Sequence, residues 1–107
     1  MDFEMITPVQ LEVYVENPDA LIIDLREPEE YMERHIRGAV NIPYEKIKDC
    51  GMFPMDVWLV FYCERGSLSL SAAKELAKKG YMVKSVVGGL HAYRGKKTES
   101  LKSKRRY

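Results

Sequence analysis

The sequence predicts an α/β domain with a mainly parallel sheet and helices packed against it. Two features indicate this class. Apolar runs of strand length alternate along the chain with segments whose apolar residues recur at helical spacing. The longest run, residues 57–62, is apolar at every position, which is typical of a strand covered on both faces, as in parallel sheets.

The first half of the chain begins with a helix signal. Thr7 can accept hydrogen bonds from free amides at a helix start, and Pro8 has the backbone angle that a first helical residue needs. The helix is expected to run to about Glu16, because the Asn-Pro pair at 17–18 disfavours helical backbone. The elements expected next are a buried strand over 21–24, a helix over 28–34, a strand over 38–42 and a short helix over 44–50.

The second half is organised around the strand at 57–62. A polar loop over 63–67 follows it and leads into a helix from about 69 to 79 with apolar residues at helical spacing. Gly80 stands just after that helix, where a left-handed glycine commonly ends one. The last expected elements are a strand over 82–87 and a short helix over 90–94.

The charge distribution separates a domain from a basic tail. A chain of 107 residues suffices for one compact domain, which we place at residues 1–95. Residues 96–107 carry six basic side chains and one acid, against 11 basic and 15 acidic side chains in the rest. Such a tail is usually a flexible, solubilising end. A nucleic-acid partner is not expected, because the tail's one aromatic residue, Tyr107, offers no stacking platform.

The cysteines and the hydropathy pattern favour a cytoplasmic protein. Cys50 and Cys63 form neither a disulfide framework nor a Cys-x-x-Cys metal pair, so free thiols in a reducing setting are expected. No apolar run approaches the ~20 residues of a membrane helix, and the acidic N-terminus does not read as a secretory signal. We therefore expect a monomer with no metal and no membrane partner.

Cys63 is the candidate nucleophile, because it directly follows the most apolar strand, and ligands of open α/β sheets bind beyond the carboxyl ends of strands. Free amides and the dipole at the start of the next helix favour a negatively charged sulfur, whether thiolate or persulfide. Gly66 permits a turn that points these amides inward, and Ser67 and Ser69 can donate hydroxyl protons or cap the helix. The alternative is a small, inert buried cysteine.

Three groups of residues together resemble rhodanese-like domains and cover residues 7–95 in the family's order. The first is Asp-Leu-Arg-Glu-Pro-Glu-Glu-Tyr at 24–31, with His-Ile-Arg-Gly-Ala at 35–39 and Asn-Ile-Pro at 41–43. The second is Tyr62, Cys63, Gly66, Ser69, Ala72, Ala73, Leu76, Gly80 and Tyr81. The third is Val-Gly-Gly-Leu-His-Ala-Tyr at 87–93.

The resemblance implies a five-stranded, mainly parallel sheet with helices on both faces. It also implies a sulfurtransferase without a cofactor, in which Cys63 takes sulfane sulfur from thiosulfate or a persulfide donor. The sulfur then passes to a thiophilic acceptor such as cyanide, a small thiol or a protein thiol. The implied substrate-binding loop consists of Glu64, Arg65, Gly66, Ser67, Leu68 and Ser69. Asp24 and Arg26 match the family's Asp-x-Arg element and are expected to form a structural ion pair near the loop's rim.

The loop departs from the family pattern at two positions. Many members have a basic residue five positions after the cysteine, where this chain has Leu68. Glu64 adds a negative charge next to the nucleophile, which Arg65 can offset only if its side chain faces the pocket. We expect weak turnover of the dianion thiosulfate and a preference for a less charged or protein-bound persulfide donor.

Other readings of these residues remain open. A phosphatase or arsenate reductase would need an arginine six positions after the cysteine, where this chain has Ser69. The main alternative is a non-catalytic regulatory or protein-binding module. His35 is expected to be structural, and Cys50 to be a bystander rather than a thiol that resolves oxidised Cys63.

Overall fold

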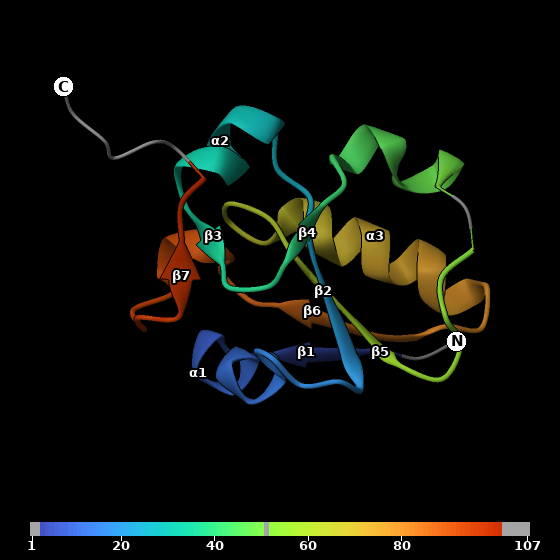
Figure 1. Ribbon diagram of the computed structural model, residues 1–107. Helices are drawn as coiled ribbons and strands as arrows, with labels where there is room; N and C mark the ends of the chain where they lie inside the picture. Colours follow the sequence, from blue (N-terminus) through green and yellow to red (C-terminus); the bar gives the residue numbers. More distant parts are fainter. Residues whose placement is uncertain (1–2, 51, 102–107) are drawn as a thin grey trace, which may run out of the picture.

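The computed structural model describes residues 3–50 and 52–101 and shows an α/β domain built on one parallel sheet (Figure 1). Its strands lie in the order β1-β6-β5-β2-β4. They are β1 (Glu4–Ile6), β2 (Ala20–Asp24), β4 (Val40–Asn41), β5 (Trp58–Tyr62) and β6 (Met82–Val86). A separate antiparallel pair consists of β3 (His35–Ile36) and β7 (Thr98–Glu99). The five-stranded parallel sheet implied by the family resemblance is confirmed.

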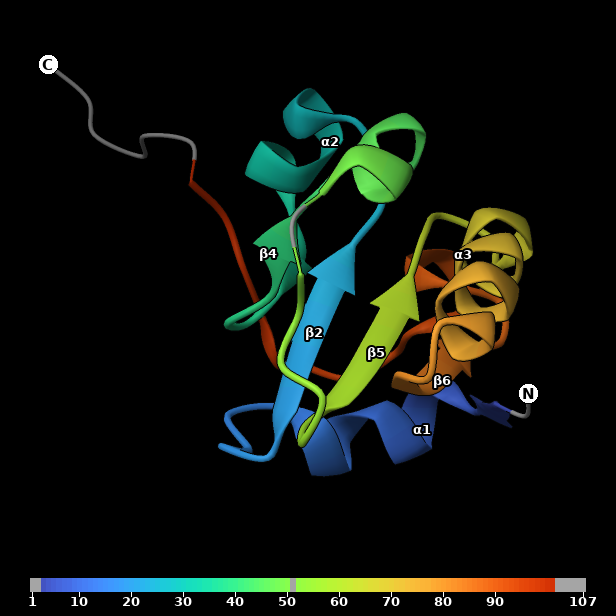
Figure 2. The same ribbon diagram turned by 90° about the vertical axis from the view of Figure 1, so that its right-hand side faces the viewer.

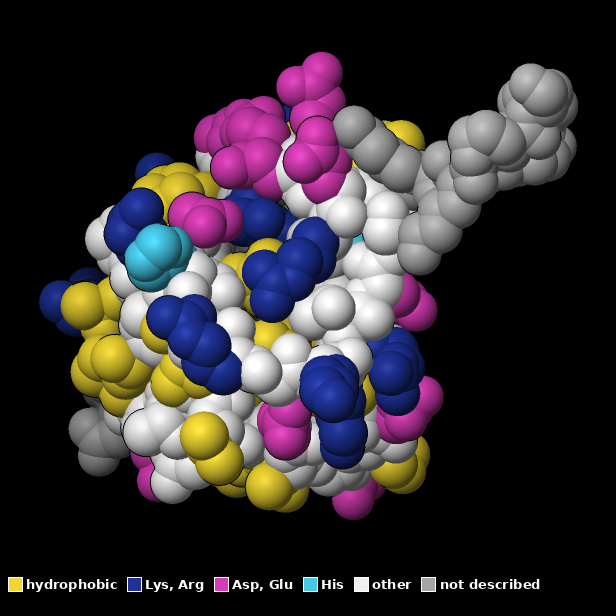
Figure 3. All heavy atoms as spheres, turned by 90° about the vertical axis from the view of Figure 1, so that its left-hand side faces the viewer, with side chains coloured by type: hydrophobic (Ala, Val, Ile, Leu, Met, Phe, Trp, Pro, Cys, Tyr) yellow, Lys and Arg dark blue, Asp and Glu magenta, His cyan; other side chains and the backbone are white. Residues whose placement is uncertain are grey.

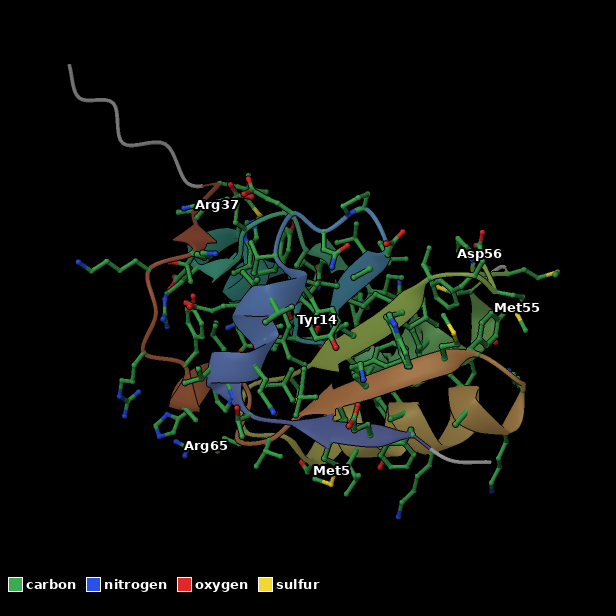
Figure 4. All side chains as sticks on the ribbon, turned by 90° about the horizontal axis from the view of Figure 1, so that it is seen from below. Met5, Tyr14, Arg37, Met55, Asp56 and Arg65 are labelled. Atoms are coloured by element: carbon green, nitrogen blue, oxygen red, sulfur yellow. The ribbon has the colours of Figure 1, made fainter. Side chains whose placement is uncertain are left out.

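Helices cover both faces of this sheet, as Figures 1 and 4 show for α1 and α3. The helical elements are α1 (Pro8–Leu11), η1 (Glu12–Tyr14), α2 (Pro28–Glu33), η2 (Tyr44–Asp49), α3 (Ser67–Lys78) and η3 (Leu90–Ala92). Leu59 and Phe61 of β5 pack with α3 and η2. Val60 and Tyr62 pack with α1 on the opposite face. Because β5 is buried on both faces, it carries no polar alternation.

The carboxyl ends of β2 and β5 lie side by side at one edge of the sheet (Figure 2). Asp24 pairs in register with Tyr62, the last residue of β5. The Leu25 amide then donates to the Tyr62 carbonyl at 2.9 Å, which extends the pairing by one residue. The loops that follow these two strands therefore begin next to each other, although they are 38 residues apart in sequence.

The N-terminal region differs from the prediction in two ways. The prediction did not include β1, a three-residue edge strand in which Met5 is half exposed and Ile6 is buried. The helix from Thr7 starts as expected, with Thr7 and Gln10 capping each other, but it is α-helical only to Leu11. It continues as a 3-10 turn because the Val15 amide bonds three residues back, to Glu12.

Four other elements differ from the prediction. The expected strand at 38–42 is reduced to β4, because Gly38 adopts a φ of 80° in the turn after β3. The expected helices at 44–50 and 90–94 are the 3-10 helices η2 and η3. Helix α3 begins two residues earlier than expected, since Gly66 at a φ of 109° turns the chain directly into it. Gly80 ends this helix with a φ of 96°, as expected.

Part of the predicted tail is ordered against the domain. Thr98 and Glu99 form β7 and pair with β3. Beyond them, the Leu101 amide donates to the Met32 carbonyl of α2 at 2.9 Å. Residues 102–107 of the predicted tail lie outside the described residues, so the division at residue 95 stays a prediction.

Candidate active site

Cys63 lies immediately after β5, and its sulfur faces two backbone amides at the start of α3. The Gly66 amide donates to Sγ at 3.1 Å and the Ser69 amide at 3.4 Å. Cys63 is only 2% exposed and packs against the apolar cluster on the α3 face. The sulfur is therefore set where a helix start favours negative charge, in a place from which bulk water is largely excluded.

Gly88 and Gly89 lie against the backbone of the Cys63 loop. Gly89 has a φ of 63°, and a Cβ built there would lie 2.4 Å from the Cys63 carbonyl oxygen. This close approach lets the Leu90 amide donate to the Cys63 carbonyl and the His91 amide to the Glu64 carbonyl, both at 2.9 Å. Because these bonds occupy the loop's carbonyls, its amides remain directed toward the sulfur.

Two serine hydroxyls fix the first turn of α3. The Ser69 hydroxyl donates to the Gly66 carbonyl at 3.0 Å, and the Ser85 hydroxyl of β6 donates to Ser69 Oγ at 3.1 Å. Ser69 thus contacts the sulfur through its amide, while its hydroxyl braces the loop. Nothing in the sequence indicated Ser85, because its contribution depends on the pairing of β6 with β5.

A buried polar network lies at the ends of β2 and β5. Arg26 donates to both carboxylate oxygens of Asp24, with Nη2 and Oδ2 3.0 Å apart. Burial alone would lower the pKa of Arg26, but the hydrogen bond and charge of Asp24 raise it. The Tyr62 hydroxyl donates to Asp24 at 2.6 Å and accepts from the Ile36 amide at 3.0 Å. Burial, followed by the charge of Asp24, raises the pKa of Tyr62. Tyr62 was expected only as an apolar core residue.

Arg26 also connects this network to the cysteine loop. Its Nη1 donates to Glu64 Oε1 at 3.2 Å, and its Nη2 donates to the Arg34 carbonyl behind α2. The Glu64 side chain is nevertheless 46% exposed. Asp24 and Arg26 thus form an ion pair beside the loop, and Arg26 also donates to Glu64, a contact that the sequence did not indicate.

The other loop residues are exposed around the sulfur. Figure 4 places Arg65 at the end of the molecule opposite Met55 and Asp56. Ser67 and Leu68 begin α3 and are also exposed. Among the described residues, Glu64 has its ion pair with Arg26, which also pairs with the fully buried Asp24, and it has none with Arg65.

Cys50 and His35 lie away from the sulfur. Cys50 lines a different pocket, together with Leu76 and Lys79 at the far end of α3, roughly 10–15 Å along that helix from Ser69. Both cysteines are free. His35 is buried, stacks on Tyr31 with ring centroids 3.8 Å apart, and bonds the Tyr31 carbonyl and the Glu99 carboxylate. These contacts fit the structural role expected for His35.

Within residues 3–50 and 52–101, no three His, Cys, Asp or Glu side chains are grouped so that they could hold a metal ion. The same part of the chain contains no helix long and apolar enough to cross a membrane.

Comparisons with known proteins agree with this fold. The family model for the rhodanese-like domain matches residues 7–96. A thiosulfate sulfurtransferase, GlpE, of Pseudomonas fluorescens is 33% identical over 95 residues, which cover 87% of this chain and 86% of that protein. The crystal structure of a rhodanese-like domain protein from Staphylococcus aureus superposes with a TM-score of 0.81 at 28% identity, covering 94% of this chain and 100% of that one.

Some relatives are much longer than this chain. A tRNA sulfurtransferase of Desulfurococcus amylolyticus is 40% identical over 76 residues, which are 71% of this chain but 15% of that protein. A probable molybdopterin-synthase adenylyltransferase of Pyropia yezoensis is likewise matched over only 25% of its length. The shared part in each case is this one domain, and the chain belongs to the rhodanese-like domain family.

Proposed function

We propose that this protein is a sulfurtransferase that carries sulfur on Cys63 as a persulfide. The observation that carries the proposal is the pair of amides, Gly66 and Ser69, that donate to Sγ at the start of α3. The same donors serve a thiolate and a persulfide anion. Membership of a family that includes thiosulfate sulfurtransferases supports this chemistry.

The first half of the transfer is a displacement at sulfur. The Cys63 thiolate attacks the outer sulfur of thiosulfate, a new S–S bond forms, and the old S–S bond breaks with its electron pair leaving on sulfite. Charge is conserved, since a monoanion and a dianion give a persulfide monoanion and the sulfite dianion. In the second half, a thiophilic acceptor such as cyanide or a thiol removes the outer sulfur.

The charges around the loop favour a donor other than free thiosulfate. Leu68 leaves no cation at the position where many relatives have one, and the half-exposed Glu64 repels a dianion. We infer weak turnover of thiosulfate and better use of a less charged or protein-bound persulfide. Glu64→Arg should raise kcat/KM for thiosulfate severalfold, and no gain would count against this inference. The free thiols fit action as a monomer in the reducing cytoplasm.

Intact-mass spectrometry tests the proposal. The protein is incubated with thiosulfate or inorganic polysulfide, freed of excess reagent and weighed. We expect a gain of one sulfur atom that disappears on treatment with cyanide. Cys63→Ala should abolish the gain, whereas the matched control Cys50→Ala should keep it.

A non-catalytic binding module is the second candidate, and the 2% exposure of Cys63 is the observation that favours it. A donor reaches a sulfur enclosed this far only if the loop moves. Failure of the parent protein to gain sulfur from thiosulfate, polysulfide and a small organic persulfide would support this reading over sulfur transfer.

A further inference from the structure

A pocket of about 260 Å³ adjoins the Cys63 loop on the side of α2. Its walls come from the ends of β2 and β5, from α2 and from η3. They are formed by Arg26, Glu30, Glu33, Arg34, Glu64 and Leu90. The pocket touches the cysteine loop twice, because Glu64 follows Cys63 directly and the Leu90 amide donates to the Cys63 carbonyl. Glu64 is thus the lining residue that is adjacent to the nucleophile in the chain, and Cys63 itself is not among the lining residues.

The pocket has an excess of negative charge. Arg26 brings no net charge to it, since the fully buried Asp24 neutralises the guanidinium. Of the remaining charged side chains that line it, three are glutamates and one is Arg34. Figure 3 views this end of the molecule and shows acidic side chains gathered over α2. Arg65, at the outer edge, is not among the lining residues.

We propose that Glu64 determines acceptor specificity by favouring thiols that carry a positive charge near the sulfur, the aminothiol class. This inference rests on the proposed sulfur transfer and concerns its second half. Arg26 holds Glu64 beside the loop at 3.2 Å, yet nearly half of the Glu64 side chain stays open to solvent. Its carboxylate can therefore attract an ammonium group without leaving Arg26, and it repels an anionic acceptor.

The step itself needs no further reagent. The acceptor thiol gives its proton to the outer sulfur of the Cys63 persulfide anion, the resulting thiolate attacks that sulfur, and an S–S bond forms between them. The S–S bond to Cys63 breaks, its electron pair stays on Cys63 as thiolate, and the proton remains on the sulfur transferred. The amides of Gly66 and Ser69 receive the leaving thiolate.

The test compares three small thiols at equal thiolate concentration: cysteamine, 2-mercaptoethanol and 3-mercaptopropionate. Protein loaded with polysulfide is mixed with each, and loss of the Cys63 persulfide is followed by quenching and intact mass. The rate ratio of cysteamine to mercaptopropionate is compared between variants. The different intrinsic reactivities of the two thiols then cancel, because they are the same for every variant. We expect Glu64→Gln to lower this ratio about five- to tenfold, the effect of one surface charge at roughly 7 Å. Glu45→Gln, an exposed acid on η2 outside the pocket, should leave it within about twofold.

The salt dependence of this rate ratio distinguishes an electrostatic role of Glu64 from a purely structural one, because a structural role would not change with salt. Raising the ionic strength to about 1 M shortens the screening length to about 3 Å, so the parent's ratio should fall toward that of Glu64→Gln. If the persulfide forms, but the cysteamine to mercaptopropionate rate ratio is the same in the parent and in Glu64→Gln, this inference is wrong and the proposed sulfur transfer still stands. If no persulfide forms with any donor, both proposals fail.

Discussion

On the α3 flank of Cys63 the sulfur is faced by neutral backbone amides, whereas on the α2 flank charged side chains are buried and paired with one another. Gly66 and Ser69 donate to the sulfur on the first flank. Asp24, Arg26 and Tyr62 form the network on the second. The difference indicates a division of labour. Backbone amides hold the reacting anion in a fixed position. The buried ion network positions Arg26, which holds Glu64, and Glu64 sets the charge that an approaching substrate meets.

The largest effect is expected on the α2 flank. Asp24→Ala removes a fully buried carboxylate and leaves Arg26 and the Tyr62 hydroxyl without their partner. Breaking one side of a buried ion pair costs about 3–5 kcal/mol, and we expect a loss of unfolding free energy in that range in urea titrations. Glu64→Gln, which alters a half-exposed pair, should cost no more than about 1 kcal/mol. Equal losses of unfolding free energy in the two variants would contradict the distinction between the buried and the exposed charges.

Gly89, which lies against the Cys63 and Glu64 carbonyls, should be nearly as sensitive. Gly89→Ala would place a Cβ 2.4 Å from the Cys63 carbonyl oxygen at a φ of 63°. Left-handed strain of about 1–2 kcal/mol then adds to the displacement of the loop, and persulfide formation should fall at least tenfold. Gly38→Ala is the matched control, because Gly38 has a φ of 80° but no atom within 4 Å of the added Cβ. Gly38→Ala should have the same backbone strain but an unchanged persulfide yield. A similar loss of yield in both variants would mean that the contact between residue 89 and the Cys63 carbonyl is not what matters.

Alkaline pH should weaken the α2 flank selectively. Burial raises the pKa of Tyr62 above the value near 10 that applies in the unfolded chain. The folded state therefore binds this proton more tightly, and its stabilising effect is complete below pH about 10 and declines as pH rises further. We expect unfolding free energy to fall between pH about 10 and 11.5, with a shallower slope in Tyr62→Phe. An unchanged slope in that variant would assign the decline to other groups.

The smallest effect on stability is expected at β7, which pairs with β3. The Glu99 carboxylate lies 3.2 Å from His35 Nε2 and accepts from the Gly38 amide at 3.3 Å, but its side chain is 45% exposed. Glu99→Ala should therefore lower unfolding free energy by about 0.5–1 kcal/mol, measured by urea titration against Glu45→Ala. Equal stability of the two variants would mean that β7 adds little, and that the domain ends near residue 95 as the sequence suggested.

Sequence patterns predicted what depends on local signals. The unbroken apolar run of β5, the Thr7 cap and Gly80 after α3 were all interpretable from neighbouring residues. The edge strand β1 was missed because three residues with one buried side chain carry no readable period. The segments at 44–49 and 90–92 were expected to be helical, yet hydropathy does not distinguish a 3-10 turn from the start of an α-helix.

The site was only partly predictable for a similar reason. Cys63 and the amides of its loop follow from the order strand, glycine turn, helix. Contacts across the sheet do not: Ser85 braces Ser69 from the next strand, and Arg26 reaches Glu64 across 38 positions of sequence. Which charges face each other depends on the strand order, and the sequence pattern alone did not determine the pairing of β2 with β5.

The central claim is that the Gly66 and Ser69 amides donate to the Cys63 sulfur. Amide NMR of the 15N-labelled protein tests it most directly. Spectra are compared before and after loading Cys63 with sulfur, with Cys63→Ser as the control. The account predicts that the Gly66 and Ser69 amide protons shift more than any others and that neither shifts in the control. Shifts at these two amides no larger than those at remote positions such as Gly38 would contradict it.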